Sequence, residues 1–188
     1  MVFDNFYAHI GRSSNSLGSI LLSTYPKLDF SDLTEEYPRL PGTSLASVFH
    51  DRGYRTAFVT PSDLDWADWR TFLDRRGFGE CSTTTSCRAR RCSRRGAWRI
   101  AAPSTSMIQF IEKEPAQPFF LMAWSQQTHH PYEPTPGVPL IEFVRETATD
   151  AYDFGRYLNV LHETDRHIGR LFDTIRRAGL DRTTRSSW

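Results

Sequence analysis

A short run of hydroxyl and amide side chains is the part of the sequence best suited to chemistry. Ser13, Ser14, Asn15 and Ser16 directly precede an apolar stretch that ends at Pro26. Residues of this kind cap helices, and the first turn of a helix leaves N–H groups unpaired. These N–H groups could bind an anion or stabilise an alkoxide, so a serine there could be a nucleophile. The simpler alternative is that the run is only a structural cap.

A pair of histidines forms the second group with chemical potential. His129 and His130 lie in a polar loop, in the order His-His-Pro-Tyr, just after the apolar run 118–124. A continuous apolar run of this length is typical of a strand buried on both faces, so we expect it to be central in a sheet. Because parallel strands bring their carboxyl ends to one edge, His129 is predicted to lie close to Ser13. A pair of exposed loop histidines is the alternative.

The remaining pattern alternates helices and short strands, which is typical of α/β proteins with a mainly parallel sheet flanked by helices. Strands are predicted over 2–8 and 54–60 because both segments are rich in residues that favour strands. Helices are predicted where apolar residues recur three and four positions apart between caps and glycine or proline stops, namely over 13–25, 45–51, 65–75, 107–114 and 150–178.

The composition fits a single domain over 1–188. Of the 188 residues, 39% are hydrophobic and 13% are aromatic, which is enough for a buried core. The chain contains no apolar run long enough to span a membrane, and its first residues lack the basic start and apolar centre of a signal peptide. As it stands, we expect neither a membrane anchor nor export.

Residues 81–106 depart from the rest of the chain in composition. They hold all three cysteines and six arginines, but no Asp or Glu. We predict a disordered insert, because so few aliphatic side chains cannot bury enough area to offset the cost of ordering. A local shift of reading frame in the gene would explain the composition. The alternatives are an arginine-rich loop that binds phosphate or nucleic acid, and a zinc site, for which a fourth ligand is missing.

The two groups of chemical residues together resemble the sulfatase family of the alkaline phosphatase superfamily. In that family a Cys or Ser opens a helix with a Leu-Leu-Thr-Gly-x-Tyr-Pro-like ending, to which residues 21–26 are similar. Counting back from this ending puts Ser13 at the nucleophile position. Asn15 and Leu17 stand where the family's Cys/Ser-x-Pro-x-Arg signal has its proline and arginine, so conversion of Ser13 to formylglycine is not expected. Gly-Arg-Ser at 11–13 is closer to the Gly-x-Thr of phosphoglycerol transferases and lipoteichoic acid synthases.

The resemblance implies a partial alkaline-phosphatase-like fold and assigns roles to four residues. Ser13 would be the nucleophile and a shared ligand of a divalent metal (Ca, Mn, Mg or Zn), whereas Arg12, His129 and His130 would bind the substrate. The family's other metal ligands lie on an acidic strand before the nucleophile and on a strand ending in Asp-His after the long helix. We expect both strands to lie outside these 188 residues, and complete relatives are often membrane-anchored or extracytoplasmic.

The function implied is that of a metal-dependent hydrolase or transferase for sulfate or phosphate esters. In the family the metal lowers the pKa of the nucleophile's hydroxyl, which then takes the sulfuryl or phosphoryl group. With one metal ligand matched, we expect this chain by itself to be inactive. No nucleic-acid partner is expected. The alternatives from another class are a non-enzymatic remnant and an arginine-rich protein that binds anions or nucleic acid.

Overall fold

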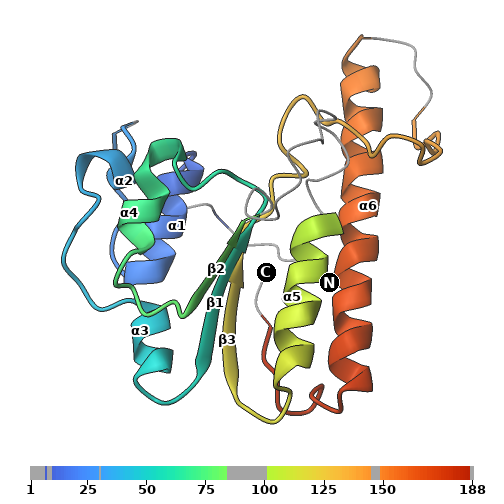
Figure 1. Cartoon of the computed structure of the whole chain (residues 1–188). Helices are drawn as coiled ribbons and strands as arrows, with labels where there is room; N and C mark the ends of the chain where they lie inside the picture. Colours follow the sequence, from blue (N-terminus) through green and yellow to red (C-terminus); the bar gives the residue numbers. More distant parts are fainter. Residues whose placement is uncertain (1–6, 8–9, 30, 84–100, 145–148, 187–188) are drawn as a thin grey trace. The chain divides into compact units, whose positions relative to one another are not determined.

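The computed structural model of the chain describes residues 7, 10–29, 31–83, 101–144 and 149–186. It is an α/β structure with a three-stranded parallel sheet, in the order β2-β1-β3, and flanking helices (Figure 1), which confirms the predicted fold class. The strands are β1 (Arg55–Thr60), β2 (Glu80–Thr83) and β3 (Phe119–Ala123). The helices are α1 (Ser13–Leu22), α2 (Leu33–Glu36), α3 (Leu45–His50), the 3-10 turn η1 (Trp66–Asp68), α4 (Trp69–Leu73), α5 (Ala101–Lys113) and α6 (Thr149–Arg177).

The chain divides into two compact units. Unit 1 comprises residues 1–56 and 64–80, and unit 2 comprises residues 57–63 and 81–188. Each unit has its own packed elements. The single domain predicted over 1–188 would require these two units to form one structure, and it stays a prediction.

In unit 1, helix α1 begins at Ser13, as predicted. It is preceded by Arg12 in an extended conformation (φ −124°, ψ 119°) and ends where Ser23 turns left-handed (φ 50°). Leu21 is fully buried, whereas Ile20, which the sequence pattern placed on the same apolar face, is 50% exposed. A Cβ added at Gly18 would lie 3.1 Å from the side chain of Leu33, so α2 packs closely on this helix. A small residue in α1 therefore permits this close approach.

Helix α3 is held by a capping box at its start and by contacts with residues 76–77. Ser44 and Ser47 form a reciprocal capping box at its start. The Ser44 hydroxyl also donates a hydrogen bond to the carbonyl of Arg76. At Gly77 the backbone is left-handed (φ 82°), and a Cβ there would lie 2.4 Å from the Cα of Ser47. Only glycine fits at this crossing of two backbones.

The predicted helix over 65–75 is interrupted. Ala67 and Asp68 both have φ of 51°, so the turn η1 is separated from α4 by a left-handed kink. The N–H of Arg70 bonds to the carbonyl of Leu64 (2.8 Å) and closes the kink. As a result Trp66 is 51% exposed, although the helical spacing placed it on the same face as the buried Trp69.

Strand β1, most of which belongs to unit 2, is buried along nearly its whole length. Its residues Ala57, Phe58 and Val59 are at most 2% exposed, and β1 lies between β2 and β3. The expectation that the run 118–124 would be central is wrong for the described strands, because β3 lies at the edge and is only partly buried. Its apolar residues pack against α5, where the rings of Phe110 and Phe119 meet edge to face at 6.2 Å.

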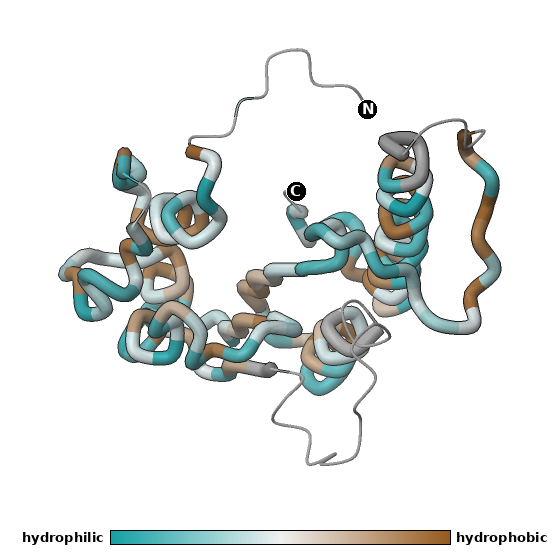
Figure 2. Tube along the Cα trace, turned by 90° about the horizontal axis from the view of Figure 1, so that it is seen from above, coloured by the Kyte–Doolittle hydropathy of each residue, from teal (hydrophilic) through white to brown (hydrophobic). Residues whose placement is uncertain are grey.

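Helices α5 and α6 lie side by side (Figure 1) and share an apolar cluster centred on Ile111, Leu171 and Ile175. Helix α6 ends before Gly179, whose φ of 69° provides the predicted stop. The segment 138–144, which follows the loop after β3, carries hydrophobic residues, drawn in brown in Figure 2. Leu140, Ile141 and Phe143 are each at least 43% exposed.

Two sequence-based predictions fall largely on residues that the structure does not describe. The strand predicted over 2–8 lies outside the described residues except for Tyr7. Of the predicted insert over 81–106, the first residues belong to β2 and the last ones to α5, which starts at Ala101 and not at 107. The central part, 84–100, is outside the described residues. Within the described part, no helix has the length and apolar character needed to cross a bilayer.

Candidate functional site

Ser13 occupies the first position of α1, where the sequence placed it. Its side chain is exposed, and its hydroxyl makes no hydrogen bond to any residue that the structure describes. The N–H groups of Ser13, Ser14 and Asn15 also have no partner among these residues, because the first helical hydrogen bond runs from Ser16 to Arg12 (3.0 Å). The first turn contains no acidic side chain. The helix therefore presents a free hydroxyl and free backbone donors, the combination that binds anions.

Directly beneath this turn lies a buried carboxylate. Asp32 is 6% exposed and accepts hydrogen bonds from Nε (3.0 Å) and Nη2 of Arg12 and from the hydroxyl of Ser14. The two guanidinium donors make a bidentate ion pair, the strongest geometry for such a contact. Ser14 is itself 1% exposed. Asp32 therefore holds both Arg12, the residue before α1, and Ser14, the second residue of the helix.

Arg12 and Asp32 each favour the charged form of the other. The hydrogen bond from Arg12 lowers the pKa of the Asp32 carboxyl below its ordinary value, and burial opposes this effect only in part. In turn, the hydrogen bond to Asp32 raises the pKa of the Arg12 guanidinium. Both groups are therefore ionised at neutral pH. The carboxylate offsets the arginine charge just below the helix start.

Asn15 holds the loop that carries Asp32. Its side-chain amide donates to the carbonyl of Ser31 (3.0 Å), and its oxygen accepts from the N–H of Leu33 (2.8 Å). The side chain is fully buried, so these bonds are shielded from water. The resemblance aligned Asn15 with a proline of the family signal, whereas in this structure it is a structural clamp.

The two predicted histidines lie in unit 2, in the loop that follows β3. Both are exposed. The Nδ1 of His129 lies 2.7 Å from the carbonyl of His130, and the ring of His130 meets that of Tyr132 edge to face at 5.5 Å. Their position after a strand agrees with the predicted loop. The predicted proximity of His129 to Ser13 stays a prediction, because the two residues belong to different units.

Helix α6 anchors this loop through three polar side chains. Arg156 donates to the carbonyl of Tyr132 (3.2 Å). Glu163, which is 3% exposed, accepts from the N–H (3.1 Å) and hydroxyl of Thr135, and Asn159 bonds both backbone groups of Ile141. These anchors were not predicted from the sequence, although polar residues on the apolar face of a long helix are a signal for them. The loop is thus held along most of its length.

A divalent metal, which members of this superfamily generally require, finds an incomplete set of ligands here. Such cations take about six to eight oxygen ligands, several of them carboxylates. In the part of the chain that the structure describes, there is no group of three or more His, Cys, Asp or Glu side chains that could hold a metal. The carboxylate of Asp32, below the start of α1, already accepts hydrogen bonds from Arg12 and Ser14. The described residues of this site therefore do not fit a metal by themselves.

Solved structures show which known fold this chain resembles. The chain is similar to the lipoteichoic acid synthase LtaP from Listeria monocytogenes, with a TM-score of 0.76 and 16% identity over 94% of this chain and 43% of that chain. It is also similar to a protein of the alkaline phosphatase superfamily from Vibrio parahaemolyticus, with a TM-score of 0.54 and 16% identity over 86% of this chain and 38% of that chain. The chain therefore spans less than half the length of either structure.

Sequence comparison identifies the family. A search of curated proteins found no match. The likeness to solved structures, at 16% identity, shows the fold alone. The family model described as Sulfatase, however, matches residues 1–185, nearly the whole chain. The chain therefore belongs to the sulfatase family.

Proposed function

We propose that this chain carries the nucleophile of an enzyme that transfers the sulfuryl or phosphoryl group of an ester, and that Ser13 is this nucleophile. The observation that supports the proposal best is the exposed Ser13 hydroxyl, which has no hydrogen-bond partner among the described residues, at a helix start without a side-chain cap. In a helix built for stability alone, an acceptor would cap these donors. The resemblance of residues 11–26 to the family's nucleophile segment favours the same residue, and the chain belongs to that family.

The proposed reaction proceeds by displacement at the phosphorus or sulfur atom. The Oγ atom of Ser13 forms the new bond, the ester bond breaks, and its electron pair leaves with the alcohol oxygen. The hydroxyl proton of Ser13 passes to that oxygen or to solvent. Water or a second alcohol then takes the group from Ser13, which gives hydrolysis or transfer respectively. The free N–H groups of the first turn would bind the non-bridging oxygens.

Three further residues would contact the substrate in this proposal. Arg12 uses Nε and Nη2 for Asp32, so Nη1 is the guanidinium nitrogen left for an ester oxygen. His129 and His130 are exposed and would contribute ring nitrogens as donors. Asp32 has a positioning role, because it holds Arg12 and Ser14 and does not face the ester.

Metal dependence is part of the proposal and limits what the chain does by itself. A divalent cation supplies nucleophile activation and charge neutralisation when bound. Of the family's ligands, the resemblance assigns Ser13 alone to these residues. We therefore propose that the isolated chain binds sulfate or phosphate weakly and turns over neither ester class.

The proposal is tested with the chain as it is and with an extended version. Aryl sulfates and aryl phosphates are assayed with Mn²⁺, Ca²⁺, Mg²⁺ and Zn²⁺, and we expect no turnover by the isolated chain. A version joined to the family's acidic strand and Asp-His strand should gain metal-dependent turnover. In that version Ser13→Ala should abolish it, because the bond-forming oxygen is removed. Ser16→Ala, a matched change in the same helix, should retain most of it.

Two results would contradict the proposal. Equal turnover by the extended chain and its Ser13→Ala variant would exclude Ser13 as the nucleophile. Metal-dependent turnover by the isolated chain, lost in Ser13→Ala, would support the nucleophile and refute the proposed inactivity.

A further inference from the structure

A buried arginine without a carboxylate partner lies in unit 1. Arg76 is 7% exposed, and in the described part of the chain it forms no ion pair. Its guanidinium donates instead to the carbonyls of Phe72 (2.9 Å), Leu40 (2.6 Å) and Gly42 (3.4 Å). It also lies over the ring of Phe72, 4.6 Å from its centre. Its positive charge is therefore solvated by dipoles but not neutralised.

The burial of Arg76 has a measurable electrostatic consequence. Desolvation lowers the pKa of its guanidinium below the ordinary value. The lowered pKa of Arg76 indicates that its described surroundings provide no negative charge to compensate its own. An anion bound nearby would supply it, and would be held more strongly than at a fully solvated surface.

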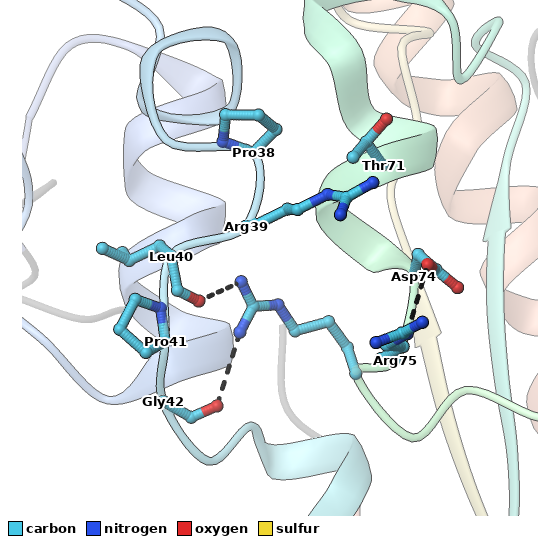
Figure 3. Close-up of a pocket in the computed structure, with 9 residues that line it drawn as sticks. Pro38, Arg39, Leu40, Pro41, Gly42, Thr71, Asp74 and Arg75 are labelled. Atoms are coloured by element: carbon cyan, nitrogen blue, oxygen red, sulfur yellow. Dashed lines mark hydrogen bonds and ion pairs between the residues drawn. The ribbon is translucent and has the colours of Figure 1, made fainter.

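A hollow of about 260 Å³ lies beside this arginine (Figure 3). One wall is the loop 38–42, and the other is the end of α4 with the residues that follow it, including Thr71, Asp74 and Arg75. This volume is enough for a tetrahedral anion with a small organic group. None of the lining residues belongs to α1.

The open side of the hollow is positively charged. Arg39 is exposed and has no partner among the described residues; in Figure 3 it extends from its loop toward Thr71. Arg75 is 91% exposed in its side chain, and its only described ion pair is a long one with Asp74 (3.8 Å). Together with Arg76, the lining of the hollow thus holds three guanidinium groups and one carboxylate, which leaves an excess of positive charge.

The loop that carries Arg39 is preorganised. The N–H of Leu40 bonds to the carbonyl of Tyr37 (2.9 Å), which closes a turn with Pro38 and Arg39 at its centre. Proline fixes φ at both Pro38 and Pro41, and Arg76 ties the carbonyl of Leu40 to the other wall. A binding wall that is already ordered loses little entropy when a ligand binds.

From this charge, shape and rigidity we propose that the hollow binds the anionic group of a small phosphate or sulfate monoester. Arg39 and Arg75 contact its oxygens from the two walls, and the Thr71 hydroxyl, which has no partner among the described residues, supplies a neutral donor. Planar guanidinium groups match tetrahedral oxyanions in geometry. Arg76 contributes charge from below while it keeps its bonds to the carbonyls.

The test uses the full 188-residue chain at low ionic strength, since salt screens exposed charges. Inorganic phosphate, inorganic sulfate and glucose 6-phosphate are titrated while amide resonances are followed by NMR, and calorimetry gives the Kd. We expect the largest shifts at Leu40, Gly42 and Thr71. The double variant Arg39→Ala/Arg75→Ala should bind about tenfold more weakly, because two charge-assisted contacts are lost. Comparison of phosphate with sulfate decides between the two anions.

The matched control is Arg52→Ala, which removes an exposed arginine of the same unit that follows α3 and donates to the carbonyl of Val48. It should change the Kd by less than about twofold, because a single remote charge is screened. The two pocket arginines are exposed, so the double variant should keep the thermal stability of the wild type. Unchanged affinity in the folded double variant would overturn the inference. Binding that is lost in Ser13→Ala and kept in the double variant would do so too, because it would place the anion at α1.

Discussion

The guanidinium of Arg12 and the carboxylate of Asp32 join the residue before α1 to the residue before α2 through two hydrogen bonds. The side chain of Asp32 is 7% exposed and that of Arg12 is 36% exposed, so the pair is shielded mainly on the acidic side. Ser14 adds a third donor. The geometry of the candidate nucleophile, Ser13, thus depends on an acidic residue 19 positions further along the chain.

The first prediction concerns the stability that Asp32 provides. Asp32→Asn should lower the free energy of unfolding by about 2 kcal/mol, because a neutral amide cannot satisfy two guanidinium donors and a buried hydroxyl together. Urea unfolding at pH 7 measures the change. Asp51→Asn, at an exposed site beside His50, is the control and should change stability by less than about 0.5 kcal/mol. Equal effects of the two substitutions would contradict the structural role of Asp32.

The second prediction is the pH dependence of that contribution. The pKa of Asp32 is lowered in the folded chain, chiefly by the hydrogen bond from Arg12, so its stabilisation is present above the unfolded pKa of about 3.9. It should be lost as the pH falls through the lower folded pKa, where the native carboxylate also becomes protonated. The stability gap between wild type and Asp32→Asn should therefore be constant from pH 7 to 5 and close below pH 4. A gap that widens on acidification would refute the assigned direction.

Several local elements of the fold follow from nearby sequence signals. The start of α1 at Ser13, the cap at Ser44 and the strand 55–60 each depend on neighbouring residues, and all three agree with the structure. The stop at Gly179 is equally local. Such features can be predicted because propensities and caps act within one or two turns.

The support of the site could not be predicted in the same way. Asp32 directly precedes α2 but makes no side-chain cap hydrogen bond there, and nothing in the local sequence shows that it binds Arg12 instead. Asn15 has the appearance of a cap and is in fact a buried clamp. The kink at Ala67 replaces a regular amphipathic helix. In each case contacts between distant segments determine the local structure. The spacing of apolar residues in the sequence does not reveal such contacts.

The third prediction concerns the crossing at Gly77. Gly77→Ala should destabilise the chain by about 3 kcal/mol, because the new Cβ would overlap the backbone of Ser47 and φ is positive as well. Gly53→Ala is the matched control, since φ there is 79° and nothing lies within 4 Å of the new Cβ. It should cost only about 1 kcal/mol, the strain of a left-handed alanine. Thermal unfolding of both variants measures the difference, and similar losses would contradict a steric cause.

The fourth prediction concerns Glu163, which binds the N–H and hydroxyl of Thr135 in the loop that follows the two histidines. Glu163→Ala should speed amide hydrogen exchange at Thr135 by about tenfold, because the loop loses its buried acceptor. Asp165→Ala, an exposed acidic position on the same helix, should leave this exchange rate nearly unchanged. Exchange that is equally fast in both variants would show that the loop does not depend on this anchor.

The last prediction concerns His167, a buried histidine on α6. It is 7% exposed, and its Nδ1 lies 3.3 Å from the hydroxyl of Ser104 on α5. Burial lowers its pKa below 6.5, and Arg170 and Arg166 add to this effect while Glu163 opposes it. The folded chain therefore disfavours the charged ring more than the unfolded chain does.

The sign of the resulting pH dependence follows from proton binding. Between the lower folded pKa and the unfolded value near 6.5, the unfolded chain binds more protons, so stability should fall as the pH falls through this window. His167→Gln removes the titrating group and should flatten the stability profile between pH 7 and 5, as measured by urea unfolding. The exposed His162 on the same helix provides the control, and His162→Gln should keep the slope. If the wild type gained stability on acidification through this window, the neutral, buried state of His167 would be wrong.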